Sequence, residues 1–157
     1  MLRGTGASEL AVVAMLALFG SAFLSATLVP MASEGVLAGL VATGRHDPWI
    51  LWIVASAGNV TGAVVNWWLG RGLARFQDRR WFPVSPAAMA RASTWFTRWG
   101  TWTLLLSWLP MVGDALTVVA GALGVRLGVF VVLVTVGKAA RYAVVLLVML
   151  GLLSGLG

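Results

Sequence analysis

Four charged side chains stand inside segments that are otherwise apolar. Glu34 and Asp114 each follow a proline by four residues. Lys138 and Arg141 stand three residues apart in the last apolar run and therefore share a helix face. At about 2.5 to 3.5 kcal/mol for each charge at a helix centre, the four cost on the order of 10 kcal/mol unless they are paired or hydrated. Two bases on one face can hold an anion while a carboxylate exchanges a proton, which predicts a buried anion site. Internal ion pairs that only fix the packing are the alternative.

The composition indicates an integral membrane protein. Of 157 residues, 60% are hydrophobic and 10% charged, and the mean hydropathy is +0.93. The apolar runs at 10–33, 49–69 and 127–153 approach or exceed the roughly 20 residues of a membrane span. The net charge is +6, and most basic residues border apolar segments, so the expected partner is an anionic lipid surface and not nucleic acid. Without cysteine and with His46 as the single histidine, no metal or cofactor is expected.

The sequence contains an internal repeat. Residues 24–44 align with residues 104–124 without a gap, at an offset of 110 − 30 = 80. Proline and acidic residues are rare in apolar segments, so their coincidence predicts a duplication. Arg3, the apolar run that follows and the small residues near Ser25 would also fit a cleaved signal peptide, but the repeat argues against this. The matched pairs are Pro30 with Pro110, Met31 with Met111, Glu34 with Asp114 and Gly44 with Gly124.

Each copy is predicted to form a re-entrant hairpin. Proline removes a backbone donor and disfavours helix in the residue before it, so the chain should break at Pro30 and Pro110. The pieces beyond the breaks, 35–44 and 115–124, are about half a span long. Irregular backbone at that depth is tolerated only against protein or water, so both breaks should line an interior cavity.

A full span is predicted after each hairpin. In the first span, a stripe of small residues with one amide on a single face favours close helix packing. Tryptophans at both ends of this span predict two aromatic belts. The stripe is Gly58, Gly62, Asn66 and Gly70, and the belts are Trp49 with Trp52 and Trp67 with Trp68.

The basic segment 71–98 joins the two copies and is predicted to be cytoplasmic. Ser85 and Pro86 form a helix start, and the amphipathic segment that follows should lie in the membrane interface. With this loop inside, the two copies have opposite topology, as in secondary transporters. We therefore predict an all-α membrane protein with one transmembrane domain, 1–157: repeat 1 at about 10–70, the linker 71–98, and repeat 2 at about 99–153. Lipid-surface contacts are predicted at Arg71, Arg75 and Arg79.

Three motifs resemble the DedA family, whose members are also called SNARE-associated or VTT-domain proteins. SEGVLAG after VPM resembles the first re-entrant motif, GNVTGAVVNWWLGRG the glycine-rich span, and SWLPMVGD the second motif around a proline. GKAARY in the last span is most similar to the short YqaA branch, and the resemblance covers roughly residues 20–145.

The resemblance implies a multi-pass bacterial inner-membrane protein whose relatives translocate polyprenyl phosphate or other lipids, with proton coupling. It also implies that Glu34 matches the acid of the first re-entrant motif. The chain departs from the family pattern in having Ser107 and Gly113 where arginines surround the second proline, and Asn59 where the glycine-rich span carries an acid.

We therefore predict a transporter of a lipid phosphate and not an enzyme. Proton coupling is assigned to Glu34 and Asp114. A non-catalytic membrane-homeostasis protein is one alternative; the other is an intramembrane lipid phosphatase that uses Glu34 or Asp114 as acid or base near Ser107. Oligomeric state is not predicted. The predicted substrate-binding residues are Lys138, Arg141, Pro30, Pro110, Asn59, Asn66 and Ser107.

Overall fold

The computed structural model describes residues 3–26, 32–74, 84–110 and 112–155, and these residues form helices and short connections without a strand. Three of the helices are long and apolar enough to cross a membrane, over 8–25, 48–72 and 127–154. This agrees with the predicted all-α membrane class. The elements in order are α1 (Arg3–Ser25), α2 (Ala32–Ala42), α3 (Pro48–Leu73), α4 (Pro86–Trp99), the 3₁₀ helix η2 (Gly100–Trp108), α5 (Val112–Ala122) and α6 (Leu127–Ser154).

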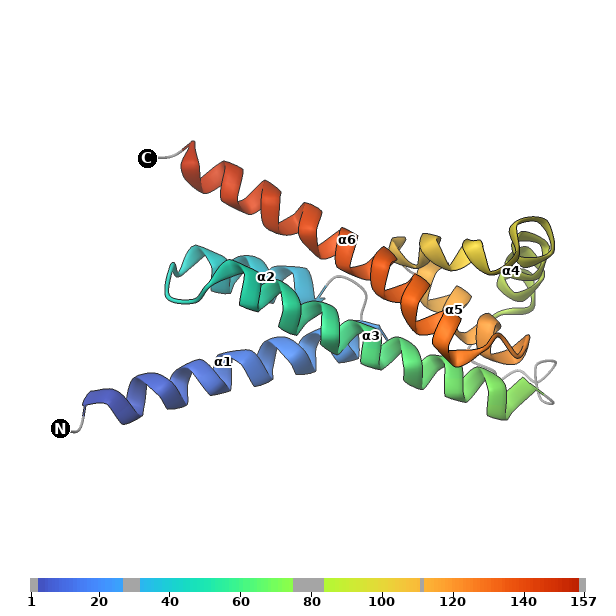
Figure 1. Cartoon of the computed structure of the whole chain (residues 1–157), viewed down its shortest axis with the longest axis horizontal. Helices are drawn as coiled ribbons and strands as arrows, with labels where there is room; N and C mark the ends of the chain where they lie inside the picture. Colours follow the sequence, from blue (N-terminus) through green and yellow to red (C-terminus); the bar gives the residue numbers. More distant parts are fainter. Residues whose placement is uncertain (1–2, 27–31, 75–83, 111, 156–157) are drawn as a thin grey trace.

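The long helices α3 and α6 pack against each other, and a helical hairpin flanks them toward each end (Figure 1). α1 and α2 form the hairpin toward the end that holds both chain termini. η2 and α5 form the other, at the end where α4 lies. α1 and α5 pack against α3, whereas η2 and α2 pack against α6. Each long helix therefore contacts parts of both hairpins, which ties the two halves of the chain together.

The short helices α2 and α5 occupy matching positions in the repeat. Both have 11 residues, and their starts differ by 112 − 32 = 80. Each ends two residues before a glycine with positive φ, 62° at Gly44 and 72° at Gly124. Glycine adopts this left-handed conformation without a steric penalty, and it commonly terminates helices. At about 16 Å, each helix is roughly half a membrane span long.

The predicted starts of these helices, at 35 and 115, are wrong by three residues. The chain turns at Pro110, and α5 resumes two residues later, because proline is compatible with the turn that precedes a helix. Glu34 and Asp114 consequently lie in the first helical turn of α2 and α5. A continuous helix does not pass through Pro110, as predicted, and Pro30 lies outside the described residues.

Helix capping fixes where α3 and α4 begin. The Asp47 carboxylate accepts hydrogen bonds from the backbone N–H groups of Trp49 and Ile50, at 2.8 and 3.3 Å. Ser85 accepts one from the N–H of Ala88, which confirms the predicted start of the amphipathic segment. The 3₁₀ helix η2 that follows α4 was not anticipated from the sequence.

The predicted small-residue stripe does serve helix packing, but against two partners. A Cβ atom on Gly58 or Gly62 would lie 2.5 or 2.6 Å from a backbone carbonyl oxygen of α1. A Cβ atom on Gly70 would overlap the Val118 carbonyl oxygen of α5, and one on Gly121 would overlap the Trp67 carbonyl oxygen of α3. α3 and α5 therefore cross with their backbones in contact, and a glycine on each helix permits this.

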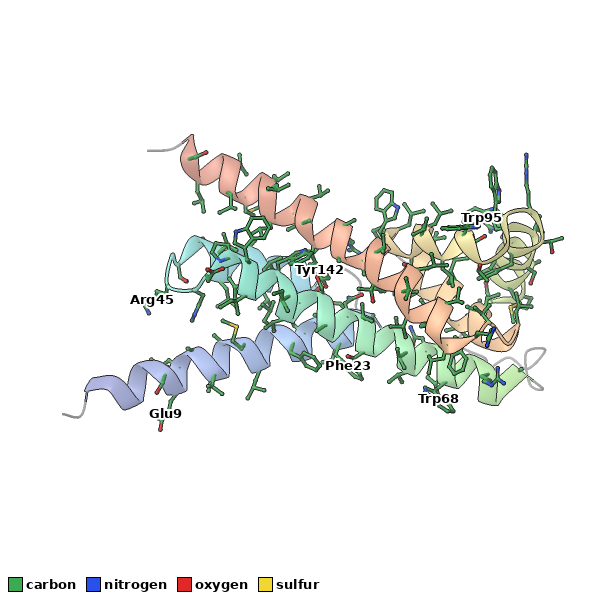
Figure 2. The ribbon with its side chains drawn as sticks, viewed as in Figure 1. Glu9, Phe23, Arg45, Trp68, Trp95 and Tyr142 are labelled. Carbon is green, nitrogen blue, oxygen red and sulfur yellow. The ribbon has the colours of Figure 1, made fainter. Side chains whose placement is uncertain are left out.

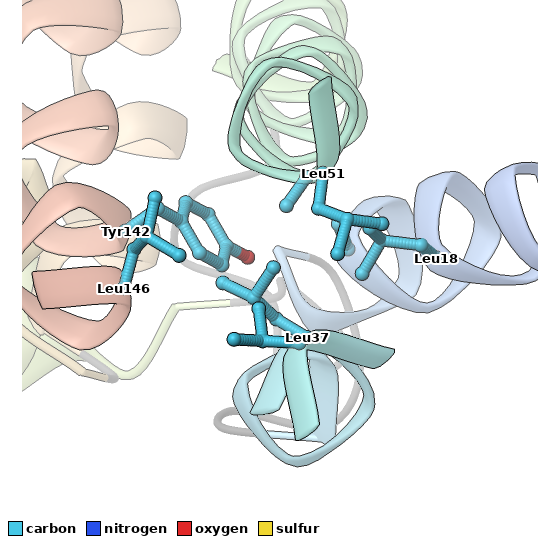
Figure 3. Packing of buried hydrophobic residues seen from close by; sticks show 8 residues of the cluster. Leu18, Leu37, Leu51, Tyr142 and Leu146 are labelled. Atoms are coloured by element: carbon cyan, nitrogen blue, oxygen red, sulfur yellow. The ribbon is translucent and has the colours of Figure 1, made fainter. Parts of the chain in front are cut away.

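Apolar side chains from four helices meet between the first hairpin and the long helices (Figure 3). One of the predicted belt tryptophans also belongs to the interior. Trp67 is 4% exposed, and its indole N–H donates to the Val125 carbonyl at 3.1 Å, so it does not face lipid as a belt residue would. The residues labelled in Figure 3 are Leu18 (α1), Leu37 (α2), Leu51 (α3), and Tyr142 and Leu146 (α6).

We expect Gly70→Ala to destabilise the fold by about 1 to 3 kcal/mol, since α5 must move to admit the methyl group. Gly72→Ala is the matched control on the same helix, because its Cβ atom would meet open space. Unfolding of the purified protein in mixed micelles, followed by tryptophan fluorescence, measures both. Equal stability of the two variants would contradict the close α3–α5 crossing.

Candidate functional site

Two ion pairs connect α6 to the starts of the two short helices. Lys138 Nζ lies 3.1 Å from Asp114 Oδ1 of α5. The Arg141 guanidinium contacts Glu34 Oε1 of α2 through both Nε and Nη2, each at 2.5 Å. The Lys138 side chain is 3% exposed and that of Asp114 24%, whereas Arg141 and Glu34 are 18% and 19% exposed. One pair is therefore centred on a fully buried cation, and the other is partly accessible on both sides.

Asn59 of α3 supplies the second ligand of Lys138. Its Oδ1 atom accepts a short hydrogen bond from Lys138 Nζ. Its Nδ2 group donates to the Tyr142 hydroxyl at 3.1 Å and to the Ala22 carbonyl of α1 at 2.9 Å. A neutral amide at this position presents its acceptor to the cation and its donors to two other oxygens. The buried side chain is thereby satisfied without a further negative charge.

The Tyr142 hydroxyl extends this network to α2. It lies 2.7 Å from Ser33 Oγ, and either hydroxyl can donate. Ser25 Oγ at the end of α1 accepts the backbone N–H of Ser33 at 3.0 Å, which satisfies a donor in the first turn of α2. Tyr142 lies near the centre of the molecule, whereas Arg45 and Trp95 lie toward opposite ends (Figure 2).

Asn66, seven residues after Asn59 on α3, also donates to a carbonyl group at the end of α1. Its Nδ2 group donates to the Ala26 carbonyl at 2.7 Å and to Thr117 Oγ1 at 3.3 Å. Thr117 in turn donates to the backbone carbonyl of Asp114 at 2.6 Å. The two asparagines therefore donate to carbonyl groups at the C-terminal end of α1, where intrahelical donors become scarce, and the Ala22 carbonyl also accepts the N–H of Ala26.

Ser107 at the end of η2 is 1% exposed, and its hydroxyl has no hydrogen-bond partner among the described residues. It lies between Gly113 and Gly137, which directly precede Asp114 and Lys138 in the sequence. A Cβ atom on Gly137 would lie 2.8 Å from Ser107 Oγ, and one on Gly113 would overlap the Ser107 carbonyl. Ser56 of α3 also has a buried hydroxyl without a partner in the described part of the chain. An unsatisfied buried hydroxyl costs about 1 to 3 kcal/mol, so both groups are available to a further polar group.

A surface groove of about 280 Å³ reaches Arg141. The other described residues that line it are apolar, so among them the guanidinium is the charged group that the groove presents. The lining residues are Trp108 of η2 and Ala140, Arg141, Val144 and Val145 of α6.

The structure brings six predicted site residues into or beside this network: Glu34, Asp114, Lys138, Arg141, Asn59 and Asn66. Pro110 is exposed at the turn before α5, and its role in the structure is to set where that helix begins. Arg71 lies at the far end of α3, with its guanidinium 5.3 Å from the Trp67 ring centroid. Pro30, Arg75 and Arg79 lie outside the described residues. Whether any of these residues binds substrate or lipid stays a prediction.

Sequence reasoning missed the hydroxyl groups of the network. Tyr142 was detectable, because it follows Lys138 by four residues and so shares its helix face. Ser33 directly precedes Glu34, but serine is too common for its position to be informative. The hydroxyl residues that were missed are Ser25, Ser33, Thr117 and Tyr142.

These features define a multi-pass helical membrane protein with two ion pairs on its last helix. The sequence matches the VTT domain over residues 10–151, and the chain belongs to this family, the DedA family. It is 39% identical over 133 residues to inner membrane protein YqaA of Escherichia coli (strain K12), which covers 85% of this chain and 89% of that protein. YqaA of Shigella flexneri gives the same values.

A protein of Haemophilus influenzae is 32% identical over 136 residues, which cover 82% of this chain and 83% of that protein. No solved structure matches the chain. Three apolar helices and the likeness to YqaA make the chain a multi-pass protein of the inner membrane.

We expect Lys138→Met to destabilise the protein by about 3 to 5 kcal/mol, because it leaves the Asp114 carboxylate without its cation. Adding Asp114→Asn should restore most of this loss, since the double variant contains neither charge. Glu34→Gln should cost less than Lys138→Met, because its partner Arg141 is partly accessible to solvent. A double-mutant cycle of unfolding free energies measures the coupling, and additive losses would show that the Asp114–Lys138 pair contributes nothing.

Proposed function

We propose that this protein is a transporter that moves an anionic lipid, of the polyprenyl phosphate class, across the inner membrane with proton coupling. One observation carries the proposal. Arg141 holds Glu34 and at the same time lines a groove whose other walls are apolar. A lipid phosphate has the matching chemistry, because its headgroup needs a cation while its chain needs an apolar surface.

The Arg141–Glu34 pair provides a means of exchange. Both guanidinium contacts go to one carboxylate oxygen, whereas a phosphate can offer the planar guanidinium fork two oxygens at once. A phosphate that approaches through the groove therefore competes with Glu34 for Arg141. A proton taken up by Glu34 releases the arginine for the lipid, and loss of that proton restores the ion pair.

The Asp114–Lys138 pair repeats this arrangement on the second short helix, with a compact cation in place of the fork. Lys138 has three protons, and the described part of the chain gives it two partners, Asp114 and Asn59. The Ser107 hydroxyl, buried beside Gly113 and Gly137, is in a position to bind a phosphate oxygen or a water that replaces one of these partners.

Inverted repeats would place both pairs near the membrane midplane. α2 and α5 start toward the middle of the molecule and run to opposite ends (Figure 1). Their equal length and constant offset support two re-entrant hairpins of one origin. The basic segment after α3 supports a cytoplasmic location for that end of the molecule. Alternating access by such repeats exposes a midplane site to one side at a time.

A non-catalytic role in membrane homeostasis is the second candidate. The observation in its favour is that both acids are already paired with both bases, so the four charges are compensated without a ligand. In that case the pairs only fix the packing of α2 and α5 on α6. Neither proposal assigns covalent chemistry to Ser107, Glu34 or Asp114.

The variant Glu34→Gln separates the two functions. The amide keeps the shape of the side chain and an oxygen for Arg141, but it cannot titrate. We expect a folded protein whose transport of a fluorescent polyprenyl phosphate analogue in proteoliposomes no longer responds to a pH gradient. Arg141→Lys should bind the same lipid about tenfold more weakly, since it loses the two-oxygen contact.

Thermal stability is measured on the same samples as transport. A stable Glu34→Gln protein with normal pH-dependent transport would refute the exchange role. Unfolding of this variant, together with lipid-independent stability of the wild type, would favour the structural role.

The topology is tested with single cysteines, for which the cysteine-free chain offers a clean background. Cysteine in place of Arg45, which is exposed before α3, should react in intact cells with a thiol reagent that the inner membrane excludes. Cysteine in place of Thr97, exposed on α4, should react only after the membrane is permeabilised. The reverse pattern would mean that the protein has the opposite orientation in the membrane. Labelling of both positions from outside would rule out the inverted repeats.

A further inference from the structure

A second groove of about 280 Å³ lies between α4 and the first half of α5, separate from the one at Arg141. Among the described residues that line it, Arg91 is the charged one, and it is exposed. The other lining residues are apolar, and Trp95 forms part of the wall. The lining residues are Ala88, Arg91, Ala92 and Trp95 of α4 and Val112, Ala115 and Leu116 of α5.

The groove lies over a packed floor. Ala92 and Leu116 are 4% and 1% exposed and belong to a buried cluster that holds α4 against α5. Since this cluster is closed beneath it, the groove does not result from loose contact between the two helices. It is a surface feature with room for a chain-like apolar ligand. The cluster also contains Val84, Val118 and Val119.

The charge on α4 determines which ligand fits. Arg91 and Arg98 are both exposed on this helix, and its sequence contains no acidic residue. Arg98 lies 5.5 Å from the Trp99 ring centroid and does not line the groove. A guanidinium at the rim with apolar walls below it matches a phosphate headgroup that carries a hydrocarbon chain. A zwitterionic headgroup adds its own cation and gains less from the same site.

We propose that this groove is a binding site for one anionic phospholipid, with its phosphate at Arg91 and an acyl chain along Trp95 and Leu116. The site is independent of the exchange at Arg141, because neither ion pair has to open for it to fill. Val112 and Ala115 flank Asp114 on α5. A lipid held there therefore contacts the start of α5. It stabilises the folded protein, because it binds the folded state and not the unfolded chain.

Native mass spectrometry of the full chain, released from micelles that contain dioleoyl phosphatidylglycerol or dioleoyl phosphatidylcholine, tests the site. We expect one phosphatidylglycerol to be retained in preference to phosphatidylcholine, with a higher melting temperature. Arg91→Gln should weaken this binding about fivefold, which corresponds to the loss of roughly one arginine–lipid interaction at a membrane surface. Arg98→Gln is the matched control and should bind as the wild type does.

A second pair of variants tests the apolar part of the groove. Ala88→Phe fills it and should abolish retention of the lipid, whereas Ala90→Phe, on the same helix outside the lining, should have no effect. In Glu34→Gln the retention of phosphatidylglycerol should depend on Arg91 and Ala88 as it does in the wild type, whether or not Arg141 binds a further lipid, so failure of the transport proposal leaves this result unchanged.

Three results would overturn the site: equal losses in Arg91→Gln and Arg98→Gln, equal losses in Ala88→Phe and Ala90→Phe, or displacement of the lipid by inorganic phosphate. The first would mean that the interface as a whole attracts anions. The second would mean that the groove is not used, and the third that a free anion suffices.

Discussion

Two cations on one face of α6 cannot remain unpaired in an apolar layer, and the rest of the structure satisfies this constraint. Lys138 and Arg141 point to partners on two different short helices. Each of these helices carries its acid in the first turn. The ion pairs therefore fix where the two hairpins meet α6. Because removal of one partner strands the other, they also limit which substitutions the fold tolerates.

A helix that ends inside the molecule needs hydrogen-bond donors for its last carbonyl groups, and side chains of α3 supply them at the end of α1. The amides of Asn59 and Asn66 bind carbonyl groups at the C-terminal end of α1, those of Ala22 and Ala26, and Asn59 also binds Lys138. Side chains of α3 thus bind both the end of α1 and the buried ammonium group of Lys138. In a membrane, where water is not available to the backbone, these contacts allow α1 to end beside α2. Glycines on α3 bring the neighbouring backbones close enough for such contacts.

The two pairs differ in accessibility, and this difference gives them separate roles in the proposed transport. The pair centred on Lys138 lies deep in the helix packing, with Asn59 and Tyr142 around it. Arg141 reaches a groove with apolar walls. Arg141 can exchange its partner for a ligand that enters the groove, whereas exchange at Lys138 requires a ligand or water to reach a buried position beside Ser107. The same four residue types can therefore support both structure and transport.

The sequence by itself determined the membrane class, the offset of 80 residues between two similar segments, the break at Pro110 and the four charged residues of interest. These follow from composition and from residue types that are rare in apolar segments. Only the tertiary structure decided which acid pairs with which base, that Trp67 is buried, and that Ser33, Thr117 and Tyr142 join the network. Those outcomes depend on contacts between residues as many as 109 positions apart. A local pattern holds no information on such contacts, because helix rotation and crossing geometry set them.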